Sequence, residues 1–252
     1  MNRTIGRAYE ALALLGSHPS GLTLKEITQS LQIPKSSAFD IVQTLLGLKL
    51  AAISKANDKK YVLGSEIFSL GMLYVSNLNV TDVYEQYLIP LADELHRNAF
   101  VAVLDELEIV YIYKYVGVGA KLATCNLGTR SDLYSTALGK VLLSYLPEDV
   151  RDRTIDRIEF KRHTEYTIMS KEALKKECIK VRNRGYATDN REREPHMLCF
   201  SCPIFDYTGN VVAAVSVSDI YYEGMDRAVI VDKLKACALN ISKALGYSKD
   251  QF

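Results

Sequence analysis

Apolar residues recur at helical spacing in two neighbouring segments near the start of the chain. In the first segment Thr23 can cap a helix, and Glu26 stands three residues later, as in a capping box. Pro34 cannot continue that helix but suits the first turn of the next one. The inward positions of the two helices are Leu24, Ile27, Leu31, Ala38, Ile41, Val42, Leu45 and Leu46. Two short helices joined by a tight turn predict a helix-turn-helix.

The outer face of the second predicted helix is small and polar, which suits contact with the edges of DNA bases. The same spacing also occurs in all-α cores, so the pattern alone leaves a purely structural role open. Asp40 in particular also suits a solvated position that touches nothing. The residues that we predict to contact DNA from the two helices are Thr23, Lys25, Lys35, Ser36, Ser37, Asp40 and Thr44.

Two short apolar runs follow around Asn57-Asp58 and predict a β-hairpin with Lys55, Lys59 and Lys60 at its tip. Such a wing would let Lys59 and Lys60 hold DNA phosphates. The charge distribution agrees. Residues 1–64 carry eight basic and four acidic residues, a net charge of +4, whereas the remaining residues carry 23 basic and 26 acidic residues, a net charge of −3. A basic N-terminal part on a slightly acidic body favours binding to DNA.

The rest of the chain alternates between helical and strand patterns. Helices are predicted at residues 4–17, 65–77, 171–184 and 225–245, within 80–98 with a start at Thr81 or Asp82, and in a segment ending near 145. Strands are predicted at 100–104, 109–113, 186–189, 198–206 and 211–219. Residues 148–170 are strongly charged and are expected at the surface. The fold class is therefore α+β, with an antiparallel sheet covered by helices. The predicted domains are a winged helix-turn-helix at 1–64, a linker helix at 65–78 and a C-terminal domain at 79–252.

The predicted linker helix is apolar on most of its surface and therefore needs a partner that covers it. The C-terminal domain is one possible partner. A second copy of the chain is the other, and we favour it, because a dimer would also set two DNA-binding domains at a fixed spacing.

Composition limits the compartment and the class of protein. A chain of 252 residues is long enough for two domains, and 48% hydrophobic with 24% charged residues is typical of a soluble protein. No apolar run approaches the roughly 20 residues that cross a bilayer, and the N-terminus lacks the apolar core of a signal peptide. Five scattered cysteines favour reduced thiols. We therefore expect a cytoplasmic protein without membrane contact.

Several segments resemble the isocitrate-lyase-regulator (IclR) family of bacterial transcription factors. The matching stretches are LTLKEI, LQIPKSSAFDIVQTL, KKYVLGSEIFSLG, LYSTALGKVLLSYLP, GYATDNREREPHMLC and CPIFDYTGNVVAAVSVS. They cover nearly the whole chain in the order of the family. The resemblance implies a winged helix-turn-helix, a linker helix and an effector-binding domain similar to the GAF/PAS type, in proteins that act as dimers or tetramers.

The resemblance also implies an effector pocket in the C-terminal domain. Its residues would be Ala137, Leu138, Asp189, Met197, Cys199, Ser216 and Ser218. The amides of Ala137 and Leu138 at a helix start suit an anion. From spacing alone, Ser216 and Ser218 suit the polar outer face of an amphipathic strand better than a pocket, and only the resemblance reverses this. Asp189 equally suits the cap of a local turn.

This chain departs from the family pattern at three places. Phe39-Asp40 stands where the recognition helix usually carries a polar-basic pair, so base preference should be its own. Ser131-Asp132 replaces a frequent leucine-proline before the LYSTALGK motif, and His196 replaces the glycine near the pocket cysteine. Both of these changes fall at the implied pocket.

These features together predict a DNA-binding transcriptional regulator rather than an enzyme. We expect a repressor of a catabolic operon that binds double-stranded operator DNA, a small carboxylate or sugar-acid-like effector and a second copy of itself, with no cofactor and no metal. The alternatives concern thiols. Cys199 and Cys202 form a lone CxxC that could serve a redox or metal-responsive regulator, and Cys199 with His196 or His163 could form a thiol enzyme.

Overall fold

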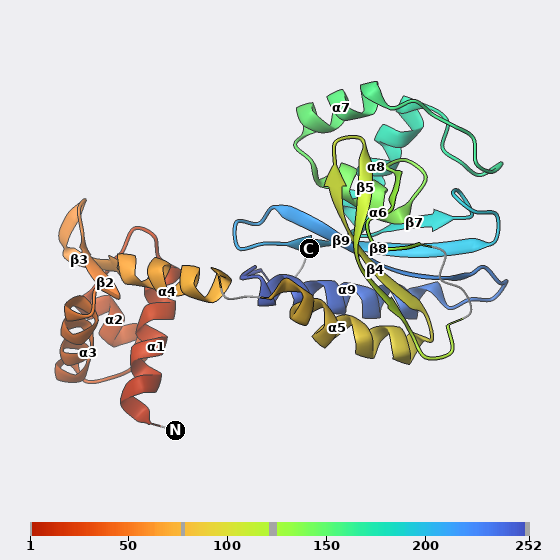
Figure 1. The fold of residues 1–252 in the computed structure, drawn as a ribbon. Coiled ribbons are helices and arrows are strands. Elements are labelled where there is room, and N and C mark those ends of the chain that lie inside the picture. Colours follow the sequence, from red (N-terminus) through yellow and green to blue (C-terminus); the bar gives the residue numbers. More distant parts are fainter. Residues whose placement is uncertain (1, 77–78, 121–124, 250–252) are drawn as a thin grey trace. The chain divides into compact units, whose positions relative to one another are not determined.

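The chain divides into two units, Met1–Leu78 and Asn79–Phe252, each with a hydrophobic core of its own. The coordinates are a computed structural model that describes residues 2–76, 79–120 and 125–249. Figure 1 shows the helices and strands of both units. Among the described helices, none has the length and apolar character that crossing a membrane requires.

The N-terminal unit is a winged helix-turn-helix. Its elements in chain order are α1 (Arg3–Gly16), β1 (Leu22–Thr23), α2 (Leu24–Leu31), α3 (Lys35–Gly47), β2 (Ala51–Ser54), β3 (Asn57–Leu63) and α4 (Ser65–Ser76). The three strands form an antiparallel sheet in the order β1-β3-β2. Core residues from α1, α2 and α3 pack together, so the helix pair is held against α1 as the apolar pattern predicts.

The turn between α2 and α3 follows from local side-chain chemistry. Thr23 caps α2, since its hydroxyl accepts from the amide of Glu26 at 3.3 Å and its own amide donates to Glu26 Oε2 at 2.7 Å. The Thr23 amide and hydroxyl both donate to Glu26 Oε2, and these two hydrogen bonds lower the pKa of the Glu26 carboxyl. At the other end Gln32 takes the left-handed conformation with φ 51°, and Pro34 precedes the first residue of α3. The predicted capping box and helix-breaking proline are confirmed.

The wing differs in detail from the prediction. Its turn consists of Lys55 and Ala56, and β3 already begins at Asn57. Lys59 and Lys60 therefore lie on the strand rather than at the tip. The strand continues through them because β3 has a second partner, with Lys60 opposite Thr23 of β1.

The C-terminal unit is built on a six-stranded sheet in the order β6-β5-β4-β9-β8-β7, and every neighbouring pair is antiparallel. Its strands are β4 (Asn98–Asp105), β5 (Glu108–Val116), β6 (Arg130–Asp132), β7 (Ala187–Asn190), β8 (Met197–Phe205) and β9 (Val211–Ile220). Its helices are α5 (Val80–Leu95), α6 (Ala137–Tyr145), α7 (Glu148–Arg157), α8 (Lys171–Arg184) and α9 (Arg227–Ala244). In Figure 1, α5 and α9 cover one face, and α6 with α7 and α8 covers the other.

Three elements of this unit differ from the predictions. Helix α7 lies within residues 148–170, a charged segment in which no helix was predicted. Only Arg151 and Ile155 of this helix are buried, so its sequence carries too few apolar positions to show a helical pattern. The three-residue strand β6 is too short to give an alternating pattern. Helix α5 begins at Val80 with Asn79 as its cap, one to two residues before the predicted start.

Helix α6 packs unusually close to the preceding segment, and Gly139 makes this possible. A Cβ on Gly139 would lie 2.5 Å from both Cα and the carbonyl oxygen of Leu133. Both contacts are with backbone, which a side-chain movement cannot relieve. The glycine of LYSTALGK therefore fixes where the start of α6 lies relative to β6.

We expect Gly139→Ala to lower the free energy of unfolding of the C-terminal unit by about 1–3 kcal/mol, the usual cost of overpacking. Urea unfolding followed by circular dichroism measures this change. Gly47→Ala at the end of α3 is the matched control, because nothing lies within 4 Å of the added Cβ, and alanine there should be neutral or stabilising by about 0.5–1 kcal/mol. Equal stability of Gly139→Ala and the wild type would refute the close packing.

Candidate functional sites

The C-terminal unit contains one cavity lined by every residue that the family resemblance assigns to an effector pocket. The cavity has a volume of about 50 Å³, which leaves room for several water molecules or one small ligand. The described residues that line it are Phe100, Tyr111, Cys125, Thr136, Ala137, Leu138, Asp189, Arg193, Glu194, Met197, Cys199, Ser216 and Ser218. The structure thus brings together the seven predicted residues, and their binding of an effector stays a prediction.

Hydrogen-bonding groups gather on one side of this cavity. Ala137 and Leu138 open α6, where the first backbone amides have no acceptor within the helix. Thr136 caps the helix by accepting from the amide of Gly139 at 3.0 Å. Ser216 and Ser218 lie on β9, where alternate residues share a face. Only 3% and 5% of their surfaces are exposed, so the alternative of a polar outer face is wrong. Within the described part of the chain neither hydroxyl has a hydrogen-bond partner.

Asp189 serves both the cavity and the loop beside it. Its Oδ1 accepts from the amides of Glu192 and Arg193 at 2.7 and 3.2 Å, so the predicted turn cap exists. Burial raises the pKa of its carboxyl from 3.8 to about 7, although Lys140 acts in the opposite direction. This carboxyl therefore holds its proton to a higher pH than an exposed aspartate, and in its protonated form it can donate as well as accept a hydrogen bond.

Aromatic and thiol side chains form the apolar wall. Phe100 of β4 and Tyr111 of β5 meet edge to face with ring centres 5.7 Å apart, and Met197 and Cys125 complete this side. The sequence predictions missed Phe100, Tyr111, Cys125, Thr136, Arg193 and Glu194. The strand pattern gives a usable signal only for Phe100 and Tyr111, because each occupies an inward position of a predicted strand.

The thiol alternatives are not supported by the arrangement of the cysteines. Cys199 lines the cavity, whereas Cys202 is fully buried and lies near Lys235 and Cys237 of α9. The two residues are three apart on β8 and therefore face opposite sides of the sheet. Burial raises the pKa of both thiols well above their ordinary value, which disfavours the reactive thiolate. Among the described residues no group of three or more His, Cys, Asp and Glu could hold a metal ion.

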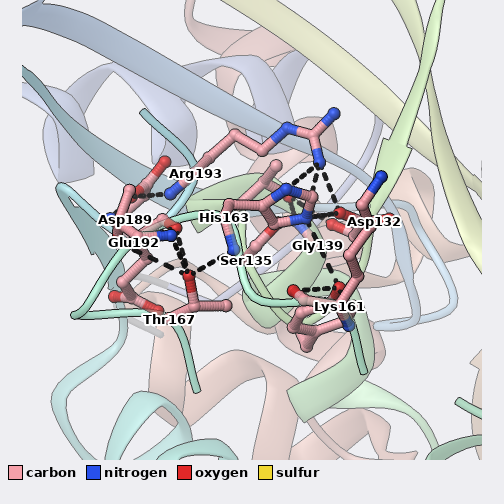
Figure 2. Close-up of polar contacts among 12 residues, drawn as sticks. Asp132, Ser135, Gly139, Lys161, His163, Thr167, Asp189, Glu192 and Arg193 are labelled. Atoms are coloured by element: carbon pink, nitrogen blue, oxygen red, sulfur yellow. Dashed lines mark hydrogen bonds and ion pairs between the residues drawn. The ribbon is translucent and has the colours of Figure 1, made fainter. Parts of the chain in front are cut away.

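A cluster of charged and polar residues joins the start of α6 to the loop between β7 and β8 (Figure 2). Lys140 Nζ lies 2.5 Å from Glu192 Oε1, and the lysine is 1% exposed. Asp132 Oδ2 lies 2.5 Å from Arg193 Nη1 and 2.6 Å from His163 Nε2. Ser131, Asp132 and His196, the departures expected at the pocket, are not among the described residues that line the cavity. Asp132 instead contacts the lining residue Arg193.

The predicted DNA-contacting residues lie on two sides of α3. Ser36 stands opposite the buried face and is exposed, and Lys35 is exposed in the first turn. Ser37, Asp40 and Thr44 instead line a groove shared with Thr4 and Arg7 of α1. The hydroxyl of Thr44 donates to the carbonyl of Asp40 at 2.8 Å.

The remaining DNA candidates are on α2 and the wing. Lys25 and Lys59 are exposed, and Lys60 is partly exposed. Thr23 uses both its hydroxyl proton and its hydroxyl oxygen within the cap of α2. The predictions missed Phe39, which is 48% exposed, and Gln43, which is exposed one turn beyond Phe39. Helical spacing from Ser36 is the signal that would have found both.

Comparisons with known proteins match both units. The model of the IclR helix-turn-helix domain matches residues 4–52, and that of the bacterial transcriptional regulator IclR C-terminal domain matches residues 72–243. The chain is 32% identical to the HTH-type transcriptional regulator KdgR of Escherichia coli over 89% of this chain and 86% of that protein.

Solved structures give the same result. The repressor BlcR of Agobacterium tumefaciens superposes with a TM-score of 0.85 at 28% identity, covering 98% of both chains. The IclR protein of Thermotoga maritima superposes with a TM-score of 0.64 at 32% identity, covering 97% of this chain and 99% of that one. The chain belongs to the IclR family of bacterial transcriptional regulators, with an N-terminal DNA-binding domain and a C-terminal effector domain, and it is not an enzyme.

Proposed function

We propose that this regulator represses a catabolic operon and that a small carboxylate or sugar-acid-like effector in the C-terminal cavity controls its affinity for DNA. The observation that carries the proposal is the polar side of the cavity. Ser216 and Ser218 carry two buried hydroxyls that have no hydrogen-bond partner among the described residues, and they line a cavity that also borders the first turn of α6. Free donors at a helix start favour an anion. The similarity to BlcR, which is described as a repressor, supports repression rather than activation.

The acidic residues of the lining narrow the class of effector. Asp189 and Glu194 border the cavity, and carboxyl groups there accept hydrogen bonds from ligand hydroxyls. A ligand with one acid group and several hydroxyls would satisfy both sides of the cavity. We therefore favour hydroxy acids and sugar acids over purely apolar acids.

The DNA-binding domain would read its operator with the exposed side of α3. Lys35 and Ser36 lie there, and we add Phe39 and Gln43 to the predicted set. Glutamine can bind adenine with two hydrogen bonds, and an aromatic ring can contact a thymine methyl group. Ser37, Asp40 and Thr44 would then contact the DNA from the groove between α1 and α3 that they line. Lys25, Lys59 and Lys60 would hold flanking phosphates, and Thr23 would position α2.

Self-association fits the surface of the N-terminal unit. Phe68, Leu70 and Leu73 on α4 are 69%, 52% and 60% exposed. Large apolar residues gathered on one helix mark an interaction surface. We propose that this helix contributes to a dimer or tetramer, and that the protein acts in the cytoplasm, where operator DNA lies. The domain limits 1–64, 65–78 and 79–252 belong to the same proposal.

A thermal-shift screen of small carboxylates, sugar acids and aromatic acids tests the effector proposal. A ligand that binds only the folded protein raises the melting temperature by mass action. We expect a hit among the hydroxy or sugar acids, and we expect Ser216→Ala to lose it. Ser201→Ala is the matched control, because Ser201 pairs with Ser216 across β8 and β9 but its hydroxyl donates to Val215 outside the cavity lining. A panel without any hit would count against the cavity as an effector site.

The phosphate contacts of the wing are tested by salt dependence. We expect Lys59→Ala with Lys60→Ala to reduce the slope of log affinity against log salt by about two, since each lost phosphate contact contributes about 0.9. Fluorescence anisotropy with a DNA fragment measures the slope. The control is Lys176→Ala with Lys180→Ala on exposed positions of α8, which should leave it unchanged. An unchanged slope in the wing variant would exclude both contacts.

The raised pKa of Asp189 predicts a pH-dependent stability. Between about pH 4 and pH 7 the folded protein keeps a proton that the unfolded chain has released, so this carboxyl destabilises the folded state as pH rises through that window. Asp189→Asn keeps the Oδ1 acceptor but cannot ionise. Its stability relative to wild type should rise across the window, by up to about 4 kcal/mol, and level off above it. Urea unfolding at several pH values measures this; a difference independent of pH would contradict it.

A further inference from the structure

We propose that Arg193 is a specificity-determining residue of the cavity: its guanidinium pairs with the acid group of the effector, and Asp132 competes with the effector for it. This inference rests on the proposed effector site and names the side chain that binds the charged group of the ligand. Arg193 is the one basic residue among the described residues that line the cavity, and it shares that lining with the acidic Asp189 and Glu194. Without a cation, this lining would repel an acid.

One carboxylate oxygen of Asp132 has more partners than it can satisfy well. Its Oδ2 accepts from Arg193 Nη1 at 2.5 Å, from Ser135 Oγ at 3.1 Å, and lies 2.6 Å from His163 Nε2. Arg193 Nη1 also lies 2.8 Å from that same histidine nitrogen. The three atoms of Asp132, Arg193 and His163 thus form a close triangle, visible at the centre of Figure 2.

Proton counting shows that this triangle is frustrated. A histidine nitrogen either carries a proton and donates, or has a lone pair and accepts, but it does not do both. If His163 Nε2 donates to Asp132, it faces the N–H of Arg193, and the contact is between two donors. If it accepts from Arg193, it faces the carboxylate oxygen, and the contact is between two acceptors. Departure of the guanidinium relieves both arrangements, because His163 and Ser135 then remain as donors to Asp132.

The guanidinium is close to the place where an acid group would bind. Ser135, which shares Asp132 Oδ2 with Arg193, directly precedes Thr136 and Ala137 of the cavity lining. The backbone of Arg193 is fixed at the cavity by its amide, which donates to Asp189. Its side chain is 35% exposed and has room to turn. The residue can therefore exchange Asp132 for a ligand while its main chain stays in place.

Two other basic residues near Arg193, Lys140 and Arg191, have partners of their own. Lys140 and Glu192 are joined at 2.5 Å. The guanidinium of Arg191 stacks on Tyr166 and Tyr221, 4.3 and 4.2 Å from the ring centres. Neither Lys140 nor Arg191 lines the cavity. The exchange between Asp132 and the ligand is thus confined to Arg193.

The test titrates the full chain with pyruvate, D-glycerate, D-gluconate and D-galacturonate, by calorimetry and thermal shift, in wild type, Arg193→Gln, Arg193→Lys and Asp132→Asn. We expect at least one probe to bind the wild type. Arg193→Gln should weaken that probe about tenfold or more, as the loss of a charge-assisted hydrogen bond implies, and Arg193→Lys should recover part of the affinity. Asp132→Asn should tighten it severalfold, because the competing charge is gone.

The increase in affinity in Asp132→Asn separates competition from a structural role, since a variant that merely loosened the site would bind more weakly. It also keeps the test decisive if Arg193→Gln does not fold. The hydrogen bond from Thr136 Oγ1 remains in Asp132→Asn, because it goes to the backbone carbonyl of residue 132 and not to the side chain. Unchanged affinity in Arg193→Gln, or weaker binding in Asp132→Asn, overturns this inference and leaves the effector site standing. No binding of any probe to the wild type overturns both.

Discussion

The buried ion pair between Lys140 and Glu192 is the constraint on which the cavity of the C-terminal unit depends. A lysine with 1% exposure needs a partner, because an unpaired buried ammonium is strongly destabilising. Lys140 follows the cavity residues of α6, and Glu192 lies in the loop after β7, so their contact at 2.5 Å ties the helix start to that loop. Removing one partner of such a pair typically costs about 3–5 kcal/mol, since the other charge stays buried. The same lysine also opposes the effect of burial on the pKa of Asp189.

The loop that this pair holds shows how a run of charges becomes ordered. Residues 191–194 read Arg-Glu-Arg-Glu, a composition typical of a solvated surface. Here consecutive side chains bind different elements: Arg191 stacks between two tyrosine rings, Glu192 meets Lys140, and Arg193 meets Asp132. The loop backbone is held as well, since Thr164 and Thr167 donate to the carbonyls of residues 191 and 192 at 2.6 and 2.7 Å. Order comes from partners distant in sequence.

The difference between contacts with neighbouring residues and contacts with residues distant in sequence explains which features the sequence could predict. Features set by neighbouring residues were predictable: the capping box at Thr23, the helix end at Gly185 and the main strands of the sheet. The seven pocket residues came from family motifs and not from spacing, which favoured an outer face for Ser216 and Ser218. Arg193 and its partners Asp132 and His163 gave no local signal, because β6, the 160s segment and the β7–β8 loop meet only in the folded unit.

A regulator of this kind needs a contact that differs between its free and ligand-bound states. A ligand changes DNA affinity only as far as it binds one state better than the other. The start of α6 and the hydroxyl-bearing residues Ser216 and Ser218 lie on regular elements and line the cavity without ligand. The Arg193 side chain is different, because it pairs with Asp132 in the structure without ligand, and in the exchange that we propose this pairing breaks when Arg193 meets an acid. In our proposal, the exchange at Asp132 is therefore the step at which ligand charge is converted into a change of state.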